Sequence, residues 1–371
     1  MKYILILIAS VVCAACDQAP LFYTISKEVA PKTALIPGAL TKIARQGDEL
    51  FVGNGNLWRF SGGSWGQMSK PPGTVRDVAA AEDGSLYALT MDNKTGDTAV
   101  WGKLPDDEWT ELVSAPNLGY QALFCANNVL FISRWNGTSA SDMTKSFTLL
   151  IWDGPEAFQG DNTALVNGVV YAGGKYYLAT AGEGVYMWDG VSTGLTRPFS
   201  TLSHVLGIIN LDDTHIAAVS RTGGFYQIDA STDTLTSNVA RAVIHTGALA
   251  VWTSPPPSDG SGPQKVLLIG INRNDNANYG YNEVAIKADG TLEAVPAFNE
   301  PGKGAPSSVN DYDRYLATLE KHPVHSLMQA PGVYNKTGAG LPVVFAATQK
   351  DGLWTYRDDA SVNQPVWNAQ D

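Results

Sequence analysis

Residues 49–68 read Glu49-Leu-Phe-Val-Gly-Asn-Gly-Asn-Leu-Trp-Arg-Phe-Ser-Gly-Gly-Ser-Trp-Gly-Gln-Met68. Three short apolar runs begin at Leu50, Leu57 and Trp65, and Gly-Asn or Gly-Gly turns separate them. Short apolar runs bounded by such turn residues predict antiparallel strands joined by hairpins. The same unit recurs imperfectly along the chain, so this stretch predicts a repeat architecture.

The turn between the third and fourth strands of the unit is the clearest marker of the repeat. In each copy an apolar residue leads into a turn of polar and small residues, and another apolar residue follows. The flanking pairs are Phe60 and Trp65, Leu104 and Trp109, Trp152 and Phe158, Trp188 and Leu195, Ile228 and Leu235, Ile286 and Leu292, and Tyr356 and Val362. These repeats predict an all-β fold, a seven-bladed β-propeller of four-stranded antiparallel blades over residues 40–371. A β-sandwich is the alternative, but it has no reason to repeat one turn in this way.

Several phrases of the repeat carry a family resemblance. Gly55-Asn-Leu-Trp-Arg-Phe60, Gly184-Val-Tyr-Met-Trp188 and Asp351-Gly-Leu-Trp354 resemble the propeller repeats of bacterial sensor ectodomains and of kelch-like or WD40-like lipoproteins. The resemblance implies a propeller fold and a binding role. The tryptophan-aspartate and sialidase Asp-box signatures are not kept, so no functional residue is transferred from those families.

The N-terminus has the pattern of a secretory signal. Lys2 precedes an apolar run over residues 4–9, which is too short to span a bilayer, and small residues follow. Ala14-Ala15-Cys16 resembles the lipobox of bacterial lipoproteins, whose cysteine receives diacylglycerol, although Cys13 departs from the usual aliphatic residue. We predict a signal peptide over residues 1–15 and a lipidated N-terminus and tether over residues 16–39. Cleavage by a plain signal peptidase is the alternative.

A lipid on Cys16 implies a protein anchored to the cell membrane or outer membrane on its extracytoplasmic side, in the periplasm or on the surface. The formal net charge of −11 and the absence of a Lys/Arg cluster argue against a nucleic-acid partner. The net charge also disfavours electrostatic docking to anionic lipid. A monomer is expected. The apolar neighbours of Cys125 predict a buried, inert thiol.

Long loops are expected on one face of the propeller. Antiparallel connectivity places the second-to-third-strand turns and the links between blades on one face, and the remaining turns on the other. The first face receives residues 92–98, 135–146, 272–281 and 299–325. Because binding loops tend to sit on rigid scaffolds, we predict this face to be the binding surface. Its predicted aromatic anchors are Trp135, Tyr279, Tyr281, Tyr312 and Tyr315. The alternative is that these loops are tolerated insertions without a role.

One short helix is predicted within the last of these loops, over residues 310–322. Asn310 is suited to cap its start, and Pro323 ends it. Tyr312 and Tyr315 belong to an apolar stripe at helical spacing, which either packs on the propeller or docks a partner.

The sequence contains no recognisable catalytic or metal-binding constellation. His322 and His325 are three residues apart, but Pro323 interrupts a helix that would align them, and no third zinc ligand is evident. Paired acids at residues 106–107, 212–213 and 358–359 are interpreted as turn formers. The remaining histidines are isolated from any nucleophile: His204, His215 and His245.

These observations predict a membrane-anchored extracytoplasmic lipoprotein whose propeller is a non-catalytic scaffold, without cofactor or metal. Its predicted partners are envelope proteins or a glycan. The alternative is a propeller-type glycoside hydrolase or lyase acting on polysaccharide, which requires two carboxyl groups roughly 5–10 Å apart at the channel mouth.

Overall fold

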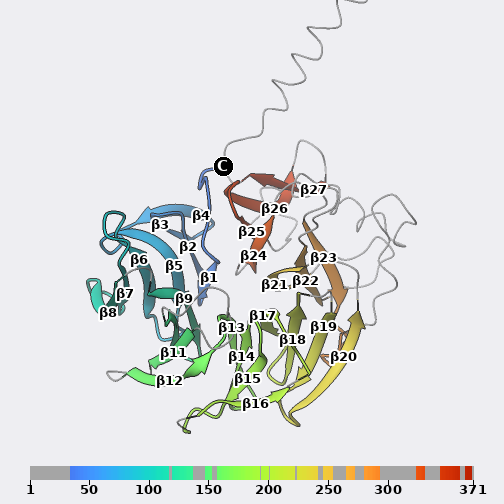
Figure 1. Ribbon diagram of the computed structural model, residues 1–371. Coiled ribbons are helices and arrows are strands. Elements are labelled where there is room, and N and C mark those ends of the chain that lie inside the picture. The colour runs from blue at the N-terminus through green and yellow to red at the C-terminus, as the bar shows by residue number, and fades with distance from the viewer. Residues whose placement is uncertain are drawn as a thin grey trace, which may run out of the picture. The chain divides into compact units, whose positions relative to one another are not determined.

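The computed structural model describes residues 34–116, 119–136, 147–152, 157–192, 194–199, 201–221, 224–240, 245–253, 265–271, 280–292, 323–330, 343–359 and 364–369. All of these residues belong to one compact unit, Ala34–Gln370. Figure 1 shows this unit as small sheets that follow one another around a common axis.

Each sheet is built from strands that are consecutive in the chain, and neighbouring strands pair antiparallel. The first three sheets are β1 (Ala44–Gln46), β2 (Glu49–Gly53), β3 (Leu57–Ser61) and β4 (Ser64–Met68); β5 (Thr74–Ala80), β6 (Leu86–Met91), β7 (Thr98–Lys103) and β8 (Thr110–Ala115); and β9 (Tyr120–Ala126), β10 (Val129–Trp135), β11 (Phe147–Trp152) and β12 (Ala157–Thr163). The next two are β13 (Val166–Ala172), β14 (Lys175–Thr180), β15 (Gly184–Trp188) and β16 (Thr196–Phe199); and β17 (Val205–Asn210), β18 (His215–Ser220), β19 (Gly224–Asp229) and β20 (Thr234–Ala240). The last two are β21 (His245–Thr253), β22 (Lys265–Ile271) and β23 (Gly280–Ala285); and β24 (Val324–Gln329), β25 (Val344–Thr348), β26 (Leu353–Asp359) and β27 (Gln364–Ala369).

The predicted seven-bladed propeller is confirmed. The marker turns join the third and fourth strands, as in the first sheet, where Phe60 lies opposite Trp65. In the sixth sheet three strands are described, and the bridge between Ile286 and Leu292 marks the start of the corresponding hairpin. No helix occurs among the described residues, and the helix predicted over residues 310–322 lies outside them.

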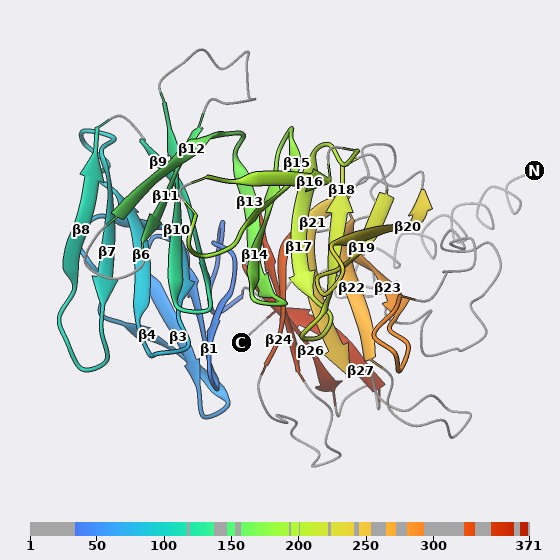
Figure 2. The same ribbon diagram turned by 90° about the horizontal axis from the view of Figure 1, so that it is seen from below.

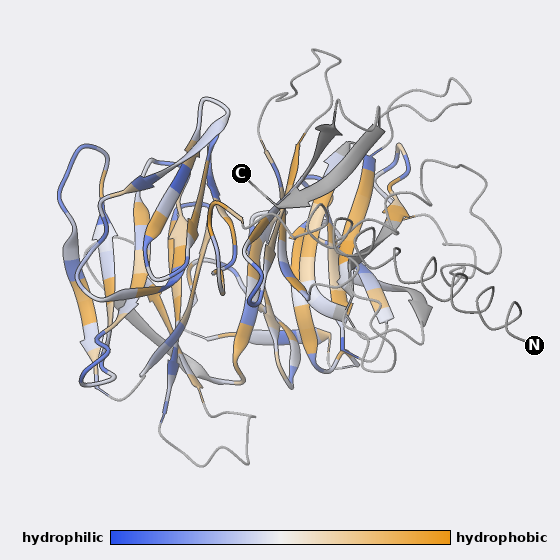
Figure 3. Ribbon diagram, turned by 90° about the horizontal axis from the view of Figure 1, so that it is seen from above, coloured by the Kyte–Doolittle hydropathy of each residue, from blue (hydrophilic) through white to orange (hydrophobic). Residues whose placement is uncertain are grey.

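The core consists of apolar clusters between neighbouring sheets, and the described residues supply one cluster for each of the seven interfaces. The interface between the last and first sheets closes the ring. There the ring of Phe345 packs edge-on against Phe60 and Trp65, with centroids 5.0 and 5.3 Å apart. Figure 3 shows hydrophobic residues concentrated along the strands, whereas the turns are mainly hydrophilic. The ring is therefore held by face-to-face packing of sheets, because alternate strand residues point into each interface.

The first strand of each sheet is innermost, and these inner strands all begin on the same side. We call this side the link face; it carries the blade-to-blade links and the second-to-third-strand turns. The opposite side, which carries the other turns, is the hairpin face. Hydrogen bonds between the fourth and fifth blades join corresponding ends of their inner strands. Asn167 Nδ2 donates to Val205 O at the link face, and Asn210 Nδ2 donates to Tyr171 O at the hairpin face. Figure 2 shows the strands running between the two faces.

Candidate functional site at the link face

Most inner strands carry a one-residue bulge close to where they leave the link face. In β5, Val75 lies opposite Thr90 and Asp77 opposite Leu89, so Arg76 is the extra residue. The extra residues of β9, β13, β17 and β24 are Gln121, Asn167, Leu206 and His325. A bulge redirects a side chain and ends regular pairing, and bulges are enriched beside functional sites.

The first blade repeats this feature just before β1. Ala44 lies opposite Phe51, and the N–H of Thr41 donates to Gly53 O at 2.8 Å, so Lys42 and Ile43 together face the single residue Val52. The exposed fraction of Lys42 is the larger, which makes it the extra residue. We call the bulged positions the mouth ring, which consists of Lys42, Arg76, Gln121, Asn167, Leu206 and His325. Their side chains are exposed or half-buried, whereas the strand residues beside them are mostly buried. Apart from Leu206, the ring therefore gathers polar and cationic residues at the link-face end of the channel.

An ion pair fixes one side of the mouth ring. The Nζ of Lys42 lies 2.5 Å from Oδ2 of Asp77 and 4.0 Å from the centre of the Phe124 ring. Asp77 also accepts the N–H groups of Leu123 and Val78, each at 2.9 Å. A buried carboxylate is tolerated when its charge is paired and its oxygens are hydrogen-bonded, and both conditions are met here. This cluster joins the inner strands of the first three blades.

The seventh blade contributes His325 and Ser326 to the same region. Ser326 Oγ accepts the N–H of Ile43 at 3.0 Å, which ties β24 to the first blade. Burial lowers the pKa of His325 below its usual value, although hydrogen bonds from its ring to the Thr41 and Leu40 backbone oppose this. His325 is therefore neutral near pH 7.

Trp135 is the predicted anchor whose side chain the structure describes. It ends β10 on the link face, is half-buried, and donates its N–H to Gly119 O at 2.6 Å. The preceding residue, Arg134, is exposed and holds its guanidinium carbon 5.9 Å from the centre of the Tyr120 ring. The N–H of Tyr120 in turn donates to Thr98 Oγ1 at 2.9 Å. Arg134 therefore lies where the second and third blades meet, and Trp135 follows it as the last residue of β10.

The other predicted anchors are not brought together in the described part of the chain. Tyr281 lies in β23 opposite Gly270, and its side chain is outside the description. Tyr279, Tyr312 and Tyr315 lie outside the described residues.

A set of aromatic residues that the sequence analysis missed supports the link-face turns. Each stands early in a third strand and bonds back into the turn before it. The indole N–H of Trp58 donates to Asn54 Oδ1 at 3.0 Å, and the hydroxyl of Tyr186 donates to Glu183 Oε2 at 2.7 Å. Trp354 donates to Asp351 O at 3.3 Å. The sequence signal was an aromatic residue directly after a buried aliphatic one, as in Leu57-Trp58 and Leu353-Trp354.

Charge is distributed unequally between the two faces. On the link face the exposed cations of the described turns and strand ends are Arg76, Lys94, Arg134, Arg221 and Lys350, and the exposed acids are Asp92 and Asp97. On the hairpin face the exposed acids of the described turns and strand ends are Asp48, Glu82, Asp83, Asp106, Asp107, Glu108, Glu111, Asp189, Asp213 and Asp289, against the exposed cations Arg45, Arg197, Lys265 and Lys287. Among the described residues, exposed acids therefore outnumber exposed cations on the hairpin face, and exposed cations outnumber exposed acids on the link face.

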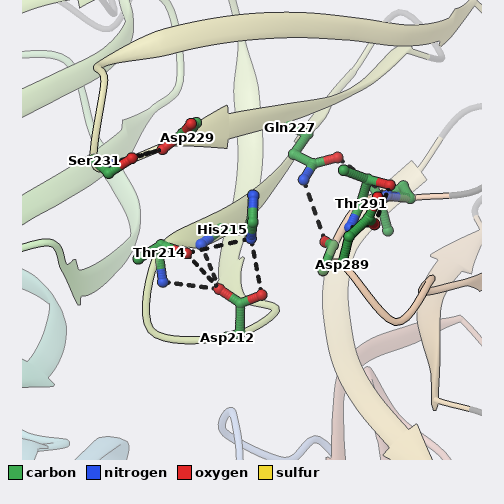
Figure 4. A network of polar contacts seen from close by, with 10 residues as sticks. Asp212, Thr214, His215, Gln227, Asp229, Ser231, Asp289 and Thr291 are labelled. Atoms are coloured by element: carbon green, nitrogen blue, oxygen red, sulfur yellow. Dashed lines mark hydrogen bonds and ion pairs between the residues drawn. The ribbon is translucent and has the colours of Figure 1, made fainter.

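His215 is not isolated, and that interpretation of the sequence was wrong. Its Nδ1 lies 2.8 Å from Oδ2 of Asp212 on the hairpin face (Figure 4). Burial opposes ionisation of Asp212, but hydrogen bonds from Thr214 and His215 outweigh it and lower the Asp212 pKa to about 2. From the same sheet, Gln227 Nε2 donates to Gly290 O at 3.2 Å, across the interface with the sixth blade. The pair therefore belongs to a structural contact between blades.

The acids interpreted as turn formers occupy turns at residues 106–107 and 212–213, whereas Asp358 and Asp359 are the last residues of β26. Along the described inner strands Asp77 is the one carboxylate, and Lys42 is paired with it. The described residues contain no group of three His, Cys, Asp or Glu side chains suited to a metal. They also contain no helix long and apolar enough to cross a membrane.

Cys125 is half-buried in β9 and unpaired with another cysteine. Burial, followed by the nearby charges of Asp83 and Glu82, raises the pKa of its thiol to about 12. Because the thiolate is the reactive form, this raised pKa disfavours reaction of Cys125 near pH 7, whereas the predicted burial of the side chain is only partial.

Comparison with known proteins gives a family match at the N-terminal end and two further similarities. Residues 2–95 match the TP013X lipoprotein family, and this stretch includes the predicted signal, Cys16 and β1 to β6. An uncharacterized lipoprotein of Treponema pallidum (strain Nichols) is 31% identical over 103 residues, which cover 26% of this chain and 21% of the relative's length. Among solved structures, the WD40 β-propeller domain of Doa1 aligns with a TM-score of 0.48 and 11% identity, covering 89% of this chain and 96% of that one. The N-terminal match supports the predicted lipoprotein.

Proposed function

We propose that this protein is a lipid-anchored, extracytoplasmic β-propeller scaffold that meets an envelope partner through its link face. The observation that carries the proposal is the match of residues 2–95 to a lipoprotein family, because it includes Cys16 in its lipobox-like context. A diacylglycerol on Cys16 holds the propeller at a membrane, and the chain from Cys16 to Ala34 serves as the tether.

The anchor is tested by the intact mass of the mature protein extracted from its native membrane. We expect an N-terminus at Cys16 with added acyl mass, and loss of that mass in a Cys16→Ala variant. Cys13→Ala is the matched control, since it also removes a cysteine from the signal but leaves the acceptor in place. An unmodified mature N-terminus at any residue would refute the anchor.

The binding role is supported by the construction of the link face. The mouth ring is fixed by the pair of Lys42 and Asp77, and aromatic residues such as Trp58 brace the turns. Rigid support of this kind reduces the ordering cost of binding. Trp135 stands on this face with Tyr279, Tyr281, Tyr312 and Tyr315 as the further anchors that the sequence predicts, and the predicted partners are envelope proteins or a glycan.

Trp135→Ala tests this surface in the anchored protein by measuring the capture of envelope components after crosslinking in native membranes. Leu104→Ala is the control, because Leu104 is a large apolar side chain that is 57% exposed in a hairpin-face turn. We expect the first variant to lose captured material and the second to retain it. Equal capture by both variants would show that Trp135 is not part of the binding surface.

A further inference from the structure

The propeller chain begins on the link face. Ile36 O accepts the N–H of Leu353 at 3.1 Å, and Gly38 O accepts the N–H of Gly352 at 3.0 Å. Both donors lie at the second-to-third-strand turn of the seventh blade, which belongs to the link face. The segment that precedes Ala34 is therefore attached to the propeller at this face.

The length of that segment limits how far the link face stands from an anchored lipid. Fully extended, the residues from Cys16 to Ala34 span at most about 60 Å at roughly 3.3 Å per residue. As a flexible chain they span roughly 25 Å on average. The anchor therefore keeps the attachment point of the link face near the bilayer, whichever way the propeller turns.

The charge distribution then favours one orientation. The link face presents the exposed cations Arg76, Lys94, Arg134, Arg221 and Lys350, whereas the hairpin face presents mainly carboxylates. These cations have no ion-pair partner within the part of the chain that the structure describes. Trp135, next to Arg134, adds a residue type that prefers the boundary between lipid and water.

Screening decides whether the net charge of −11 prevents contact with an anionic surface. Strands of about six residues separate the two faces by about 20 Å, since each residue rises about 3.3 Å. The Debye length at physiological salt is about 8 Å, so repulsion from the hairpin face is attenuated over more than two Debye lengths. With the link face toward lipid, the nearby cations act at close range. The net charge alone argues against docking, but its distribution reverses that expectation for one orientation.

We infer that the link face docks on the anionic headgroup layer of the membrane that holds the lipid anchor, so that the acidic hairpin face is turned away. This inference rests on the proposed anchor at Cys16, and it assigns the link face to a lipid surface in place of the envelope protein or glycan proposed above. The occupant is an anionic lipid surface because both the attachment point and the cations lie on the same face. An envelope protein or a glycan in that position is an outcome of the test below.

The test measures orientation of the acylated, full-length protein in vesicles. Gln349→Cys and Val191→Cys each receive a fluorescent label; both residues are exposed, uncharged and located in turns, the first on the link face and the second on the hairpin face. The vesicles contain phosphatidylcholine alone or mixed with phosphatidylglycerol, with a nitroxide-headgroup lipid as quencher. Native protein treated identically reports any labelling of Cys125.

We expect the label at residue 349 to be quenched several-fold more than the label at 191 in phosphatidylglycerol vesicles. The contrast should shrink in phosphatidylcholine vesicles and in high salt, because it depends on headgroup charge. The double variant Lys94→Gln, Arg134→Gln should reduce the contrast, whereas Lys265→Gln, Lys287→Gln on the hairpin face should leave it unchanged.

Three outcomes would overturn the inference. Equal quenching at both positions would show that the face is not oriented, and stronger quenching at 191 would reverse the orientation. A contrast that appears in native membranes but not in phosphatidylglycerol vesicles would assign the link face to a protein or a glycan. Failure of the native protein to sediment with any vesicle would instead contradict the proposed lipid anchor.

Discussion

Replacing Asp77 tests whether one carboxylate couples the inner strands of three blades. Its side chain is 9% exposed, and that of its partner Lys42 is 29% exposed. Asp77→Asn keeps an oxygen that can accept the N–H of Leu123 but removes the charge that Lys42 faces. Asp77→Ala removes the acceptor as well, and leaves the N–H groups of Leu123 and Val78 without it.

The magnitudes follow from burial. Removing one partner of a fully buried ion pair costs about 3–5 kcal/mol, and exposed pairs contribute about 1 kcal/mol or less. Because Lys42 is partly solvated, we expect Asp77→Asn to lower the free energy of unfolding by about 2 kcal/mol. Loss of acceptors for buried N–H groups adds about 1–3 kcal/mol, so Asp77→Ala should cost about 4 kcal/mol. Lys42→Met, which keeps the apolar stem over Phe124, should cost about 1–2 kcal/mol.

Urea unfolding of the single variants and of the double variant Lys42→Met, Asp77→Asn measures the coupling. We expect the double variant to lose less stability than the sum of the two single losses, by about 1 kcal/mol or more. The reason is that the second substitution removes a charge that the first has already left unpaired. Losses that add to within about 0.3 kcal/mol would refute the view that Lys42 and Asp77 act as a pair. A changed slope with urea would show instead that the unfolded state had been altered.

Three further predictions use other parts of the molecule. Gly290→Ala places a methyl group 2.5 Å from His215 Nδ1 at φ +81°, so it should lower the free energy of unfolding in urea by about 2–3 kcal/mol. Gly62→Ala is the control, because Gly62 has φ +60° but open space around it, and it should cost about 1 kcal/mol. Equal losses in the two variants would contradict the crowding at Gly290. Burial lowers the pKa of His325, so below pH ~6.5 the unfolded chain binds a proton that the folded chain does not bind. As the pH decreases below that value, the free energy of unfolding should therefore decrease more steeply in the native protein than in His325→Gln. Parallel pH profiles would exclude that role. Because the pKa of Cys125 is raised to about 12, iodoacetamide at pH 8 should alkylate the unfolded protein and spare the native one, as judged by mass; fast reaction of the native thiol would contradict its burial.

The hairpins were predictable because their signals are local. Phe60 and Trp65 flank a four-residue Ser/Gly turn and end up directly opposite each other, which needs no information from elsewhere in the chain. The fold class followed from counting such hairpins, since a four-stranded unit that repeats must bury its faces against its neighbours. The strand pattern of the sequence was therefore sufficient to predict the architecture.

The mouth ring was not predictable by the same reasoning. A one-residue bulge depends on the register between two strands, and Arg76 cannot be told from a regularly paired strand residue until Val75 and Asp77 are paired with β6. The pairing of Lys42 with Asp77 likewise joins separate blades, so their proximity exists only once the ring has closed.

Two features were readable in the sequence but were misinterpreted or missed. Asp212 accepts the N–H of Thr214 at 2.8 Å and of His215 at 2.7 Å, and a turn of this kind brings the His215 ring onto the carboxylate. Local turn chemistry could have shown that His215 has a partner. The aromatic residues of the third strands also carried a repeating signal, as in Leu57-Trp58, but it was used only as a mark of the propeller repeat.

The charge polarity that orients the proposed docking is itself a consequence of turn chemistry. Aspartates in the hairpin-face turns accept the backbone N–H two residues further on. Such contacts are made by Asp83 to Ser85 at 2.8 Å, Asp189 to Val191 at 3.0 Å, Asp212 to Thr214 at 2.8 Å, Asp229 to Ser231 at 2.8 Å and Asp289 to Thr291 at 2.9 Å. Hydrogen bonds to these carboxylates lower the pKa of several of them, including Asp189 and Asp289, so they stay charged. Because a propeller needs two tight turns per blade on this face, folding itself concentrates negative charge there. On the link face, Asp92 makes the same contact to the N–H of Lys94 at 2.7 Å. The other connections of this face include longer links and bulged strand ends, which place fewer carboxylates there, so this face can carry the cations that a membrane surface would attract.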